Sequence, residues 1–413
     1  MRINLRTPKT LSLLILCTAI IVLSGCQEKA GKPVGVVFEH DTLKRLGHRG
    51  DNWCMTWTKD GSKITSMDDG NWLEGPHRYS NHLYRISGGA NDFTRADIPG
   101  YPNFFMAENG WFGYGMYSVN GTVYSLVSKC RKNTFSGPML GLKLLKSTDN
   151  GKSWYRVNKD GQERLLKPMD DARNEITADE MFFLQESPRM HDIYPGYPFV
   201  FCSFVQNGRD NQAAKDEFIY IYSPEGAQAH RLLLARAPAK KFENRKSWEY
   251  FSGWAGDEPT WSKDINERDA VCVFDEKNPN GEYFGWYSWL PSVVWNPGLE
   301  LYIMVNGGTY GGHGMTNKVE DYYSSWMHTK TGSLGFWYAE KPYGPWKQFF
   351  YTDYWTADDD KNLTYQPKLS PKWMSADGKK MVFIWSDAMK NEQGRSHRVN
   401  YLWNQMEITI KTD

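Results

Sequence analysis

Short apolar and aromatic stretches alternate with polar, glycine-rich turns along this chain. Two apolar runs, at residues 53–57 and 64–67, flank Lys59-Asp60-Gly61-Ser62, a set of residue types typical of a tight turn. Together these stretches predict a β-hairpin. Elsewhere the spacing that marks an amphipathic helix is scarce, while 37 Gly and 20 Pro interrupt the apolar runs. The pattern therefore predicts an all-β fold.

The strand-like runs fall into five successive modules, each an aromatic and apolar strand followed by a turn and further strands. The modules cover residues 51–86, 111–157, 199–237, 292–346 and 366–410. Five such units predict a five-bladed β-propeller, in which the innermost strand of each blade lines a central channel. Seven smaller blades are the alternative, if the longer insertions contain strands of their own.

Residues 147–154 read Ser-Thr-Asp-Asn-Gly-Lys-Ser-Trp and match the Asp-box pattern Ser-x-Asp-x-Gly-x-x-Trp. This turn recurs at the outer hairpins of sialidase-like and other β-propellers. Its Asp and Gly suit a tight turn, and its Trp packs beneath that turn. We therefore assign Asp149 a structural role and not a catalytic one.

The first 25 residues have the pattern of a secretion signal. Three basic residues precede an apolar run at residues 11–23, which is too short to span a bilayer. The run ends in Leu23-Ser24-Gly25-Cys26, which resembles a bacterial lipoprotein signal with Cys26 as the lipidated residue. We expect an exported protein, anchored by lipid to a bacterial membrane and facing the periplasm or the cell surface. Residues 26–40 would form the anchor and linker, and residues 41–413 a single propeller.

The composition of the chain limits the classes of molecule that it is expected to bind. The formal net charge is +1 and no basic block stands out, which argues against nucleic acid. Aromatic residues make up 15% of the chain, with 18 Trp. Such side chains form stacking platforms for sugars, or they pack between propeller blades, and the sequence leaves both interpretations open. We expect a monomer that acts on a polysaccharide or oligosaccharide.

No cofactor is expected from the sequence. Four cysteines remain after the signal and the anchor, and their wide spacing shows no metal-ligand pattern: Cys54, Cys130, Cys202 and Cys272. The acidic run Asp358-Asp359-Asp360 offers a structural Ca²⁺ site, with a solvated turn as the alternative.

Candidate chemistry gathers at the outer ends of the first hairpin. Charged, amide and aromatic residues stand on both sides of it: Arg49, Asp51, Asn52 and Trp53 before, and Asp68, Asp69, Asn71 and Trp72 after. Antiparallel strands bring these two ends together. Paired carboxyl groups suit glycosidic cleavage, which commonly needs an acid and a base or nucleophile. We predict the pair Asp51 and Asp69, with Asp68 as the substitute for Asp69 because side chains alternate along a strand.

Other candidates lie at the expected beginning of an inner strand or in loops. Glu186 is a candidate acid by analogy with other five-bladed glycosidases, and His77 and His191 are candidate substrate contacts. Residues 306–314 form a glycine-rich loop in which Tyr310 is a further candidate. Each of these residues also has an ordinary interpretation as an exposed loop side chain.

Several motifs resemble a group of secreted bacterial propellers that includes endo-D-arabinanases. The motifs are Gly50-Asp51-Asn52-Trp53, Asp68-Asp69-Gly70, the Asp box, Tyr220-Ile221-Tyr222-Ser223, Leu234-Ala235-Arg236, Trp248-Glu249-Tyr250-Phe251, Pro259-Thr260-Trp261-Ser262 and Pro297-Gly298-Leu299-Glu300. In arabinanase-like members, two aspartates on the first blade are thought to carry the chemistry. The resemblance implies that Asp51 and Asp69 have this role.

The sequence is also similar to propeller ulvan lyases, which use Tyr, Arg and His. Tyr220 and Arg236 occupy comparable places on the third module. However, no His lies between His82 and His191, where those lyases carry two on the second blade.

Three functions are therefore open. The first is a glycoside hydrolase using the paired aspartates. The second is a polysaccharide lyase, in which Arg236 would neutralise a uronate carboxylate while Tyr220 or a His transfers the proton. The third is a lipid-anchored glycan-binding protein without catalysis.

Overall fold

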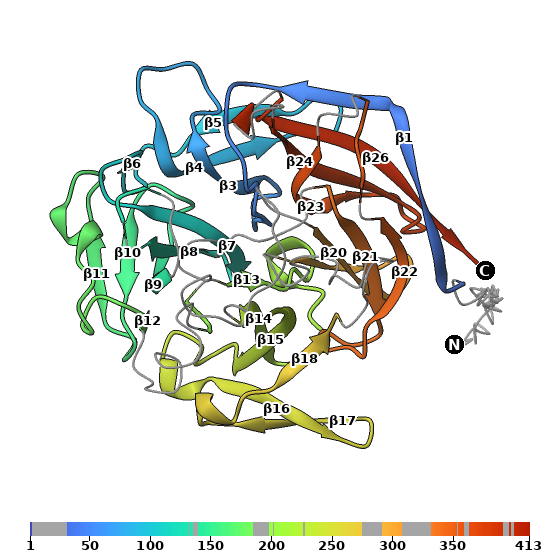
Figure 1. Cartoon of the computed structure of the whole chain (residues 1–413). Helices are drawn as coiled ribbons and strands as arrows, with labels where there is room; N and C mark the ends of the chain where they lie inside the picture. Colours follow the sequence, from blue (N-terminus) through green and yellow to red (C-terminus); the bar gives the residue numbers. More distant parts are fainter. Residues whose placement is uncertain are drawn as a thin grey trace.

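Five antiparallel sheets surround a common centre in the computed structural model (Figure 1). The structure describes Met1 and residues 31–130, 132–134, 139–184, 198–200, 202–225, 228–274, 291–307, 332–352, 354–358, 363–390, 396–397 and 400–413. Each sheet is one propeller blade, so the prediction of an all-β, five-bladed propeller is confirmed and the seven-bladed alternative is wrong.

Blades one to three follow one another along the chain. Blade one contains β2 (Met55–Trp57), β3 (Lys63–Gly70), β4 (Tyr79–Ser87), β5 (Thr94–Asp97) and β6 (Phe104–Phe105). Blade two contains β7 (Trp111–Val119), β8 (Thr122–Cys130), β9 (Met139–Ser147), β10 (Trp154–Val157), β11 (Glu163–Leu166) and β12 (Phe183–Leu184). Blade three contains β13 (Ser203–Phe204), β14 (Phe218–Glu225), β15 (Gln228–Pro238), β16 (Glu249–Ala255), β17 (Glu258–Ser262) and β18 (Ala270–Val273).

The last two blades complete the ring. Blade four contains β19 (Ser292–Asn296), β20 (Leu301–Gly307), β21 (Leu334–Ala339) and β22 (Lys347–Thr352). Blade five contains β23 (Leu363–Met374), β24 (Lys380–Lys390), β25 (Ser396–His397), β26 (Trp403–Thr412) and the N-terminal strand β1 (Pro33–Leu46). Short 3₁₀ turns η1 (Asp171–Asn174), η2 (Arg209–Asn211), η3 (Arg245–Ser247) and η4 (Ile265–Glu267) connect strands.

Strand β1 closes the ring by pairing antiparallel with β26 near the opposite end of the chain (Figure 1). The pairing begins at Pro33, opposite Thr412. The sequence assigned residues 26–40 to an anchor and linker, and this boundary is corrected, because residues from 33 onward already belong to blade five. Across the described part of the chain, no helix is long and apolar enough to cross a membrane.

The core lies between neighbouring blades, where aromatic and aliphatic side chains interlock. The Asp box illustrates how the sequence builds an outer turn. Asp149 Oδ1 accepts hydrogen bonds from the backbone N–H groups of Lys152 and Ser153, at 3.0 and 2.9 Å. The Trp154 side chain is fully buried and donates from Nε1 to the carbonyl of Gly151 at 3.2 Å. The structural role predicted for Asp149 is confirmed.

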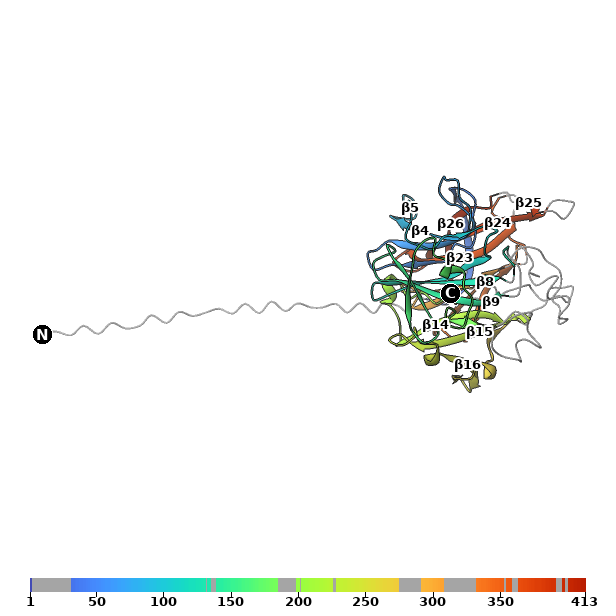
Figure 2. The ribbon, with the colours of Figure 1, turned by 90° about the vertical axis from the view of Figure 1, so that its left-hand side faces the viewer.

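The strand directions define two faces of the propeller. Strands β2, β7, β13, β19 and β23 are innermost, and their beginnings share one face, which we call the opening face. Second strands run antiparallel to them, so β24 ends on the opening face, where β25 projects (Figure 2).

Candidate active site

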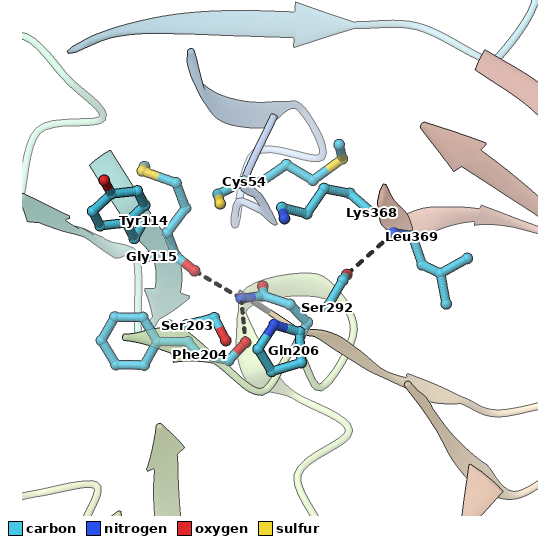
Figure 3. A pocket seen from close by; sticks show the side chains of 12 residues that line it. Cys54, Tyr114, Gly115, Ser203, Phe204, Gln206, Ser292, Lys368 and Leu369 are labelled. Carbon is cyan, nitrogen blue, oxygen red and sulfur yellow. Dashed lines mark hydrogen bonds between the residues drawn. The ribbon is translucent and has the colours of Figure 1, made fainter. Parts of the chain in front are cut away.

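All five innermost strands contribute to a cavity on the propeller axis (Figure 3). Every blade contributes at least one polar or aromatic side chain to its lining, among them Cys54, Tyr114, Gln206, Ser292 and Lys368. The empty space, including the part open to solvent, measures about 320 Å³. Cys54 lies three positions after Asp51 in the first hairpin, and the lining of the cavity includes neither Asp51 nor Asp68.

Asp51 and Asp68 are directly opposite each other in the first hairpin. Their backbones exchange two hydrogen bonds, from Asp51 N to Asp68 O at 3.0 Å and from Asp68 N to Asp51 O at 2.9 Å. Directly opposite residues of an antiparallel pair project from the same face of the sheet. Asp51 is 2% exposed and Asp68 is 3% exposed. The predicted hairpin is confirmed, and it brings these two carboxyl groups together.

Asp69 does not occupy the position opposite Asp51. It is half-buried, its φ is 56°, and its backbone carbonyl accepts a hydrogen bond from Arg49 Nε at 3.2 Å. Strand β3 continues through Asp69, and the pairing of Met55 with Thr65, if continued, would place Asp51 opposite Asp69. One extra residue on the Asp51 side, near Asn52 with its φ of 54°, shifts the pairing by one position. Asp68, the substitute named from the alternation of side chains, is the residue that faces Asp51.

Three donors hold the Asp68 carboxyl group. Asn52 Nδ2 donates to Oδ2 at 2.9 Å, while Asn81 Nδ2 and the backbone N–H of Gly113 donate to Oδ1 at 2.8 and 3.0 Å. Burial raises the pKa of Asp68 well above its ordinary value, and the Asp51 carboxylate raises it further, while the three hydrogen bonds oppose both effects. The pKa of Asp68 is raised overall, which favours the protonated form of its carboxyl group.

Gly113 is required by this packing. A Cβ atom at this position would lie 2.1 Å from Asn81 Nδ2 and 2.5 Å from Ser66 Oγ. Glycine therefore lets β7 of blade two approach the acidic hairpin closely enough to donate its backbone N–H to Asp68.

Asp51 is held from blade five. The Tyr401 hydroxyl donates a hydrogen bond to Asp51 Oδ2, and the backbone N–H of Gly50 donates to the Tyr401 carbonyl at 3.1 Å. The exposed Arg49 guanidinium lies 5.3 Å from the centre of the Tyr401 ring. The two aspartates are thus fixed by different neighbouring blades.

Asn71 and His77 lie in the loop between β3 and β4, at the rim of the opening face. Asn71 Nδ2 donates to the carbonyl of His77 at 3.1 Å, and its Oδ1 accepts from the Tyr84 hydroxyl at 2.8 Å. His77 is exposed, with its ring 5.2 Å from that of Phe105. Asn71 therefore shapes the loop, and His77 offers a side chain to solvent there.

Trp53 and Trp72 are core residues. Both are 0% exposed, and their rings lie 5.3 and 4.8 Å from that of Trp403. Trp53 Nε1 donates to Ser386 Oγ at 2.9 Å, and Trp72 Nε1 donates to the Leu46 carbonyl at 3.0 Å. Their predicted contact with substrate is corrected to a packing role, because neither ring has surface to offer a ligand.

Tyr220 and Arg236 are cross-strand partners near the start of β14 and the end of β15. Since β14 runs antiparallel to the inner strand β13, this pair lies toward the face opposite the acidic pair. The Tyr220 hydroxyl donates to Asp216 Oδ2 at 2.8 Å, and Arg236 Nε donates to Glu249 Oε2 at 3.1 Å. Burial and the Asp216 carboxylate raise the pKa of Tyr220. The structure therefore does not place Tyr220 and Arg236 near the pair Asp51 and Asp68.

Four predicted residues, Cys26, Glu186, His191 and Tyr310, lie outside the described residues. Asp359 and Asp360 of the suggested Ca²⁺ run also lie outside, and Asp358 pairs with Arg45 at 2.7 Å. Within the described ranges, no three His, Cys, Asp or Glu side chains form a group that would hold a metal ion.

The comparisons with known proteins concern the fold. No protein-family model matches this sequence, and the search of curated proteins found no match. Among solved structures, the chain is similar to the α-L-arabinofuranosidase PaAbf62A from Podospora anserina in complex with cellotriose, with 11% identity and a TM-score of 0.45 over 93% of this chain and 96% of that chain. The catalytic domain of the Coprinopsis cinerea GH62 α-L-arabinofuranosidase has 10% identity and a TM-score of 0.45, over 93% of this chain and 96% of that chain. The chain is also similar to a GH43_1 enzyme from Xanthomonas citri, with 10% identity and a TM-score of 0.40 over 90% of this chain and 95% of that chain.

Proposed function

We propose that this protein is a glycoside hydrolase that cleaves a polysaccharide or oligosaccharide at the opening face of the propeller. The observation that carries the proposal is the direct opposition of Asp51 and Asp68, two buried carboxyl groups held by separate sets of donors. Hydrolysis of a glycosidic bond uses one group that holds a proton and another that is ionised. This geometry favours such a division, because two adjacent buried carboxyl groups resist double ionisation.

The surroundings suggest which group takes which part. Asp68 holds the proton, in accord with the raised pKa of its carboxyl group. Asp51 is the ionised member, with the Tyr401 hydroxyl donating to it. In the overall reaction one water is added, its proton going to the leaving oxygen and its hydroxyl to the anomeric carbon. Asp68 is then the group that protonates the leaving oxygen, and Glu186 stays a prediction as an alternative acid.

Elimination on a uronate glycan is the second candidate, and it has less support. Tyr220 and Arg236 already bind Asp216 and Glu249, and they lie toward the opposite face from the acidic pair. A glycan-binding role without catalysis would use the same opening face, and it is distinguished by binding without cleavage.

The test is release of reducing ends from a panel of plant, algal and bacterial glycans by the full chain. We expect activity on at least one glycan, and its loss in Asp51→Asn. Asp149→Asn is the matched control, because Asp149 builds an outer turn and should leave activity unchanged. Binding to a glycan without cleavage, or equal activity in all three proteins, would overturn the proposal.

A further inference from the structure

The hairpin of β16 and β17 stands at the outer edge of blade three. Strand β16 pairs with β15 at Glu249 and Tyr250, its first two residues, while β18 lies beside an earlier part of β15. The rest of β16 pairs with β17, as far as Ala255 and Glu258 beside the tip. The hairpin therefore extends along the outside of the ring (Figure 1), where a long ligand would reach it without entering the axial cavity.

A β-bulge sets the direction of Trp254 in this hairpin. Phe251 is opposite Trp261 and Gly253 is opposite Thr260, so β16 has one residue more than β17 between these pairs. Gly253 has a φ of 136°, a conformation that favours glycine. In a regular strand, side chains three positions apart point to opposite faces, whereas the extra residue places Trp254 on the face of Phe251. The two rings lie 5.2 Å apart, which confirms that they share this face.

Three aromatic rings form one surface, which we call the outer aromatic strip: Trp254 and Trp261 from the hairpin, and Tyr343 from the turn between β21 and β22. The Tyr343 ring lies 6.4 Å from each of the two tryptophan rings. Trp254 is 37% exposed, and the other two residues are half-buried. Because β21 ends on the face opposite the opening face, the strip lies toward that side and is separate from the acidic pair.

Neighbouring side chains hold the strip in place. The Arg236 guanidinium lies 4.0 Å from the centre of the Trp261 ring, and Arg236 Nε donates to Glu249 Oε2 at 3.1 Å. The Tyr220 ring lies 6.2 Å from that of Trp261 and 6.3 Å from that of Tyr343. A ligand that stacks on the strip would therefore find ordered rings, which lowers the entropic cost of binding.

The size and charge of the strip limit what it binds. A stable protein partner buries about 800 Å² on each side, far more than one exposed indole and two half-buried rings offer. Asp257 and Glu258 at the hairpin tip are exposed carboxylates, which disfavour an acidic glycan or a nucleic acid. A neutral sugar fits both features, because its C–H face packs on an aromatic ring and its hydroxyls donate to carboxylates.

We propose that the outer aromatic strip is a second glycan-binding site, which takes a neutral polysaccharide chain and stacks one sugar ring on Trp254. The site holds the protein on a polymer while the opening face remains accessible. Its benefit to catalysis rests on the proposed function, whereas the binding itself does not.

The first measurement is affinity electrophoresis of the full chain with soluble arabinan, xylan and mixed-linkage glucan, and with polygalacturonate as the acidic glycan. All proteins carry Asp51→Asn, so that cleavage is not expected. Trp254→Ala should weaken binding to at least one neutral glycan by about tenfold or more, as expected when an aromatic anchor is removed, and leave polygalacturonate unaffected. Leu165→Ala is the matched control, because Leu165 is 48% exposed on β11 of blade two and its loss also removes exposed apolar surface.

The second measurement needs no variant of the strip. N-bromosuccinimide oxidises exposed tryptophan side chains, and mass spectrometry of peptides identifies Trp254 among the products. A neutral glycan that binds in the electrophoresis should protect Trp254 from oxidation, and polygalacturonate should not. Thermal unfolding establishes whether Trp254→Ala is folded, and if it is not, the protection of Trp254 decides.

The outcomes separate this site from the proposed hydrolase. Weaker binding in a folded Trp254→Ala, with protection of Trp254 by the same glycan, would support the strip even in a protein that cleaves no glycan, a result that overturns the hydrolase alone. Unchanged binding in a folded Trp254→Ala, a Trp254 that no neutral glycan protects, or a parent protein that binds none of them would overturn the strip, and cleavage by the wild-type chain would leave the hydrolase standing.

Discussion

Asp51 and Asp68 exchange both of their backbone hydrogen bonds, and this places two buried carboxyl groups side by side at the opening face. The relationship follows from a one-residue shift in the first hairpin between the pairing of Met55 with Thr65 and that of Asp51 with Asp68. It selects Asp68 over its neighbour Asp69, and the predictions that follow depend on it.

The pairing predicts which aspartate matters. Asp68→Asn should lower kcat/KM by about 10²–10⁴-fold, the usual range for a positioned acid or base. Asp69→Asn should change it little, because Asp69 adopts a left-handed conformation and does not face Asp51. Steady-state kinetics on the same substrate compares the two. Equal losses in both variants would contradict the pairing.

The hydroxyl of Tyr401 is expected to stabilise the ionised form of Asp51. Tyr401→Phe removes this donor while keeping the ring beneath Arg49. A hydrogen bond to a charged group contributes roughly 1.5–3 kcal/mol. Without it, the acidic limb of the pH profile of kcat/KM should move to higher pH by about one to two units. Steady-state kinetics at a series of acidic pH values gives the position of this limb. An unchanged limb with unchanged kcat would show that Tyr401 does not act on Asp51.

The approach of blade two to the hairpin predicts an effect at Gly113. Gly113→Ala places a Cβ against Asn81 and should displace the donors of Asp68, lowering both stability and activity. Gly35→Ala is the matched control, since nothing lies within 4 Å of a Cβ at that position. Denaturant unfolding and kinetics test both variants. A Gly113→Ala protein with wild-type stability and activity would be inconsistent with this packing.

Asp387 predicts a pH dependence of stability. Burial raises the pKa of this carboxyl group to about 7, although Trp385 Nε1 donates to it at 2.7 Å. The folded state therefore holds this proton more tightly than the unfolded state, and stability falls as pH rises from about 4 to 7. Asp387→Asn removes this contribution, so it should lose less unfolding free energy than wild type between pH 5 and pH 8. Parallel losses in the two proteins would contradict the assignment.

Tyr220 distinguishes hydrolysis from elimination. Its hydroxyl binds Asp216 and lies toward the face opposite the aspartate pair. Tyr220→Phe should therefore retain most of the activity, with a cost in stability of roughly 1.5–3 kcal/mol from the lost hydrogen bond to a charged group. Activity assays and denaturant unfolding measure both. A folded but inactive Tyr220→Phe would favour the lyase.

Local patterns were enough to predict the hairpin, the Asp box and five blades, since each depends on residues close in sequence. The choice between Asp68 and Asp69 was not predictable, because it depends on one extra residue between Asp51 and Met55 that shifts the pairing of the hairpin by one position. Tyr401 lies 350 positions from Asp51 along the chain, and Lys368 lies on blade five. These residues reach the site only because the five blades close into a ring. No signal within the hairpin points to either.

The aromatic residues show a different limit of sequence reasoning. Trp53 and Trp72 stand beside the acidic residues in the sequence, yet both face the core between blades one and five. Proximity along the chain does not report the direction of a side chain when a strand ends in an irregular turn. Aromatic content alone therefore does not separate packing residues from sugar platforms.

The central claim is hydrolysis at Asp51 and Asp68, and the most direct measurement is mass spectrometry of products formed in water labelled with heavy oxygen. We predict saturated oligosaccharides that carry one labelled oxygen at the new reducing end, formed by wild type and not by Asp51→Asn. Unsaturated, unlabelled products, or labelled products that form equally well in Asp51→Asn, would contradict the claim.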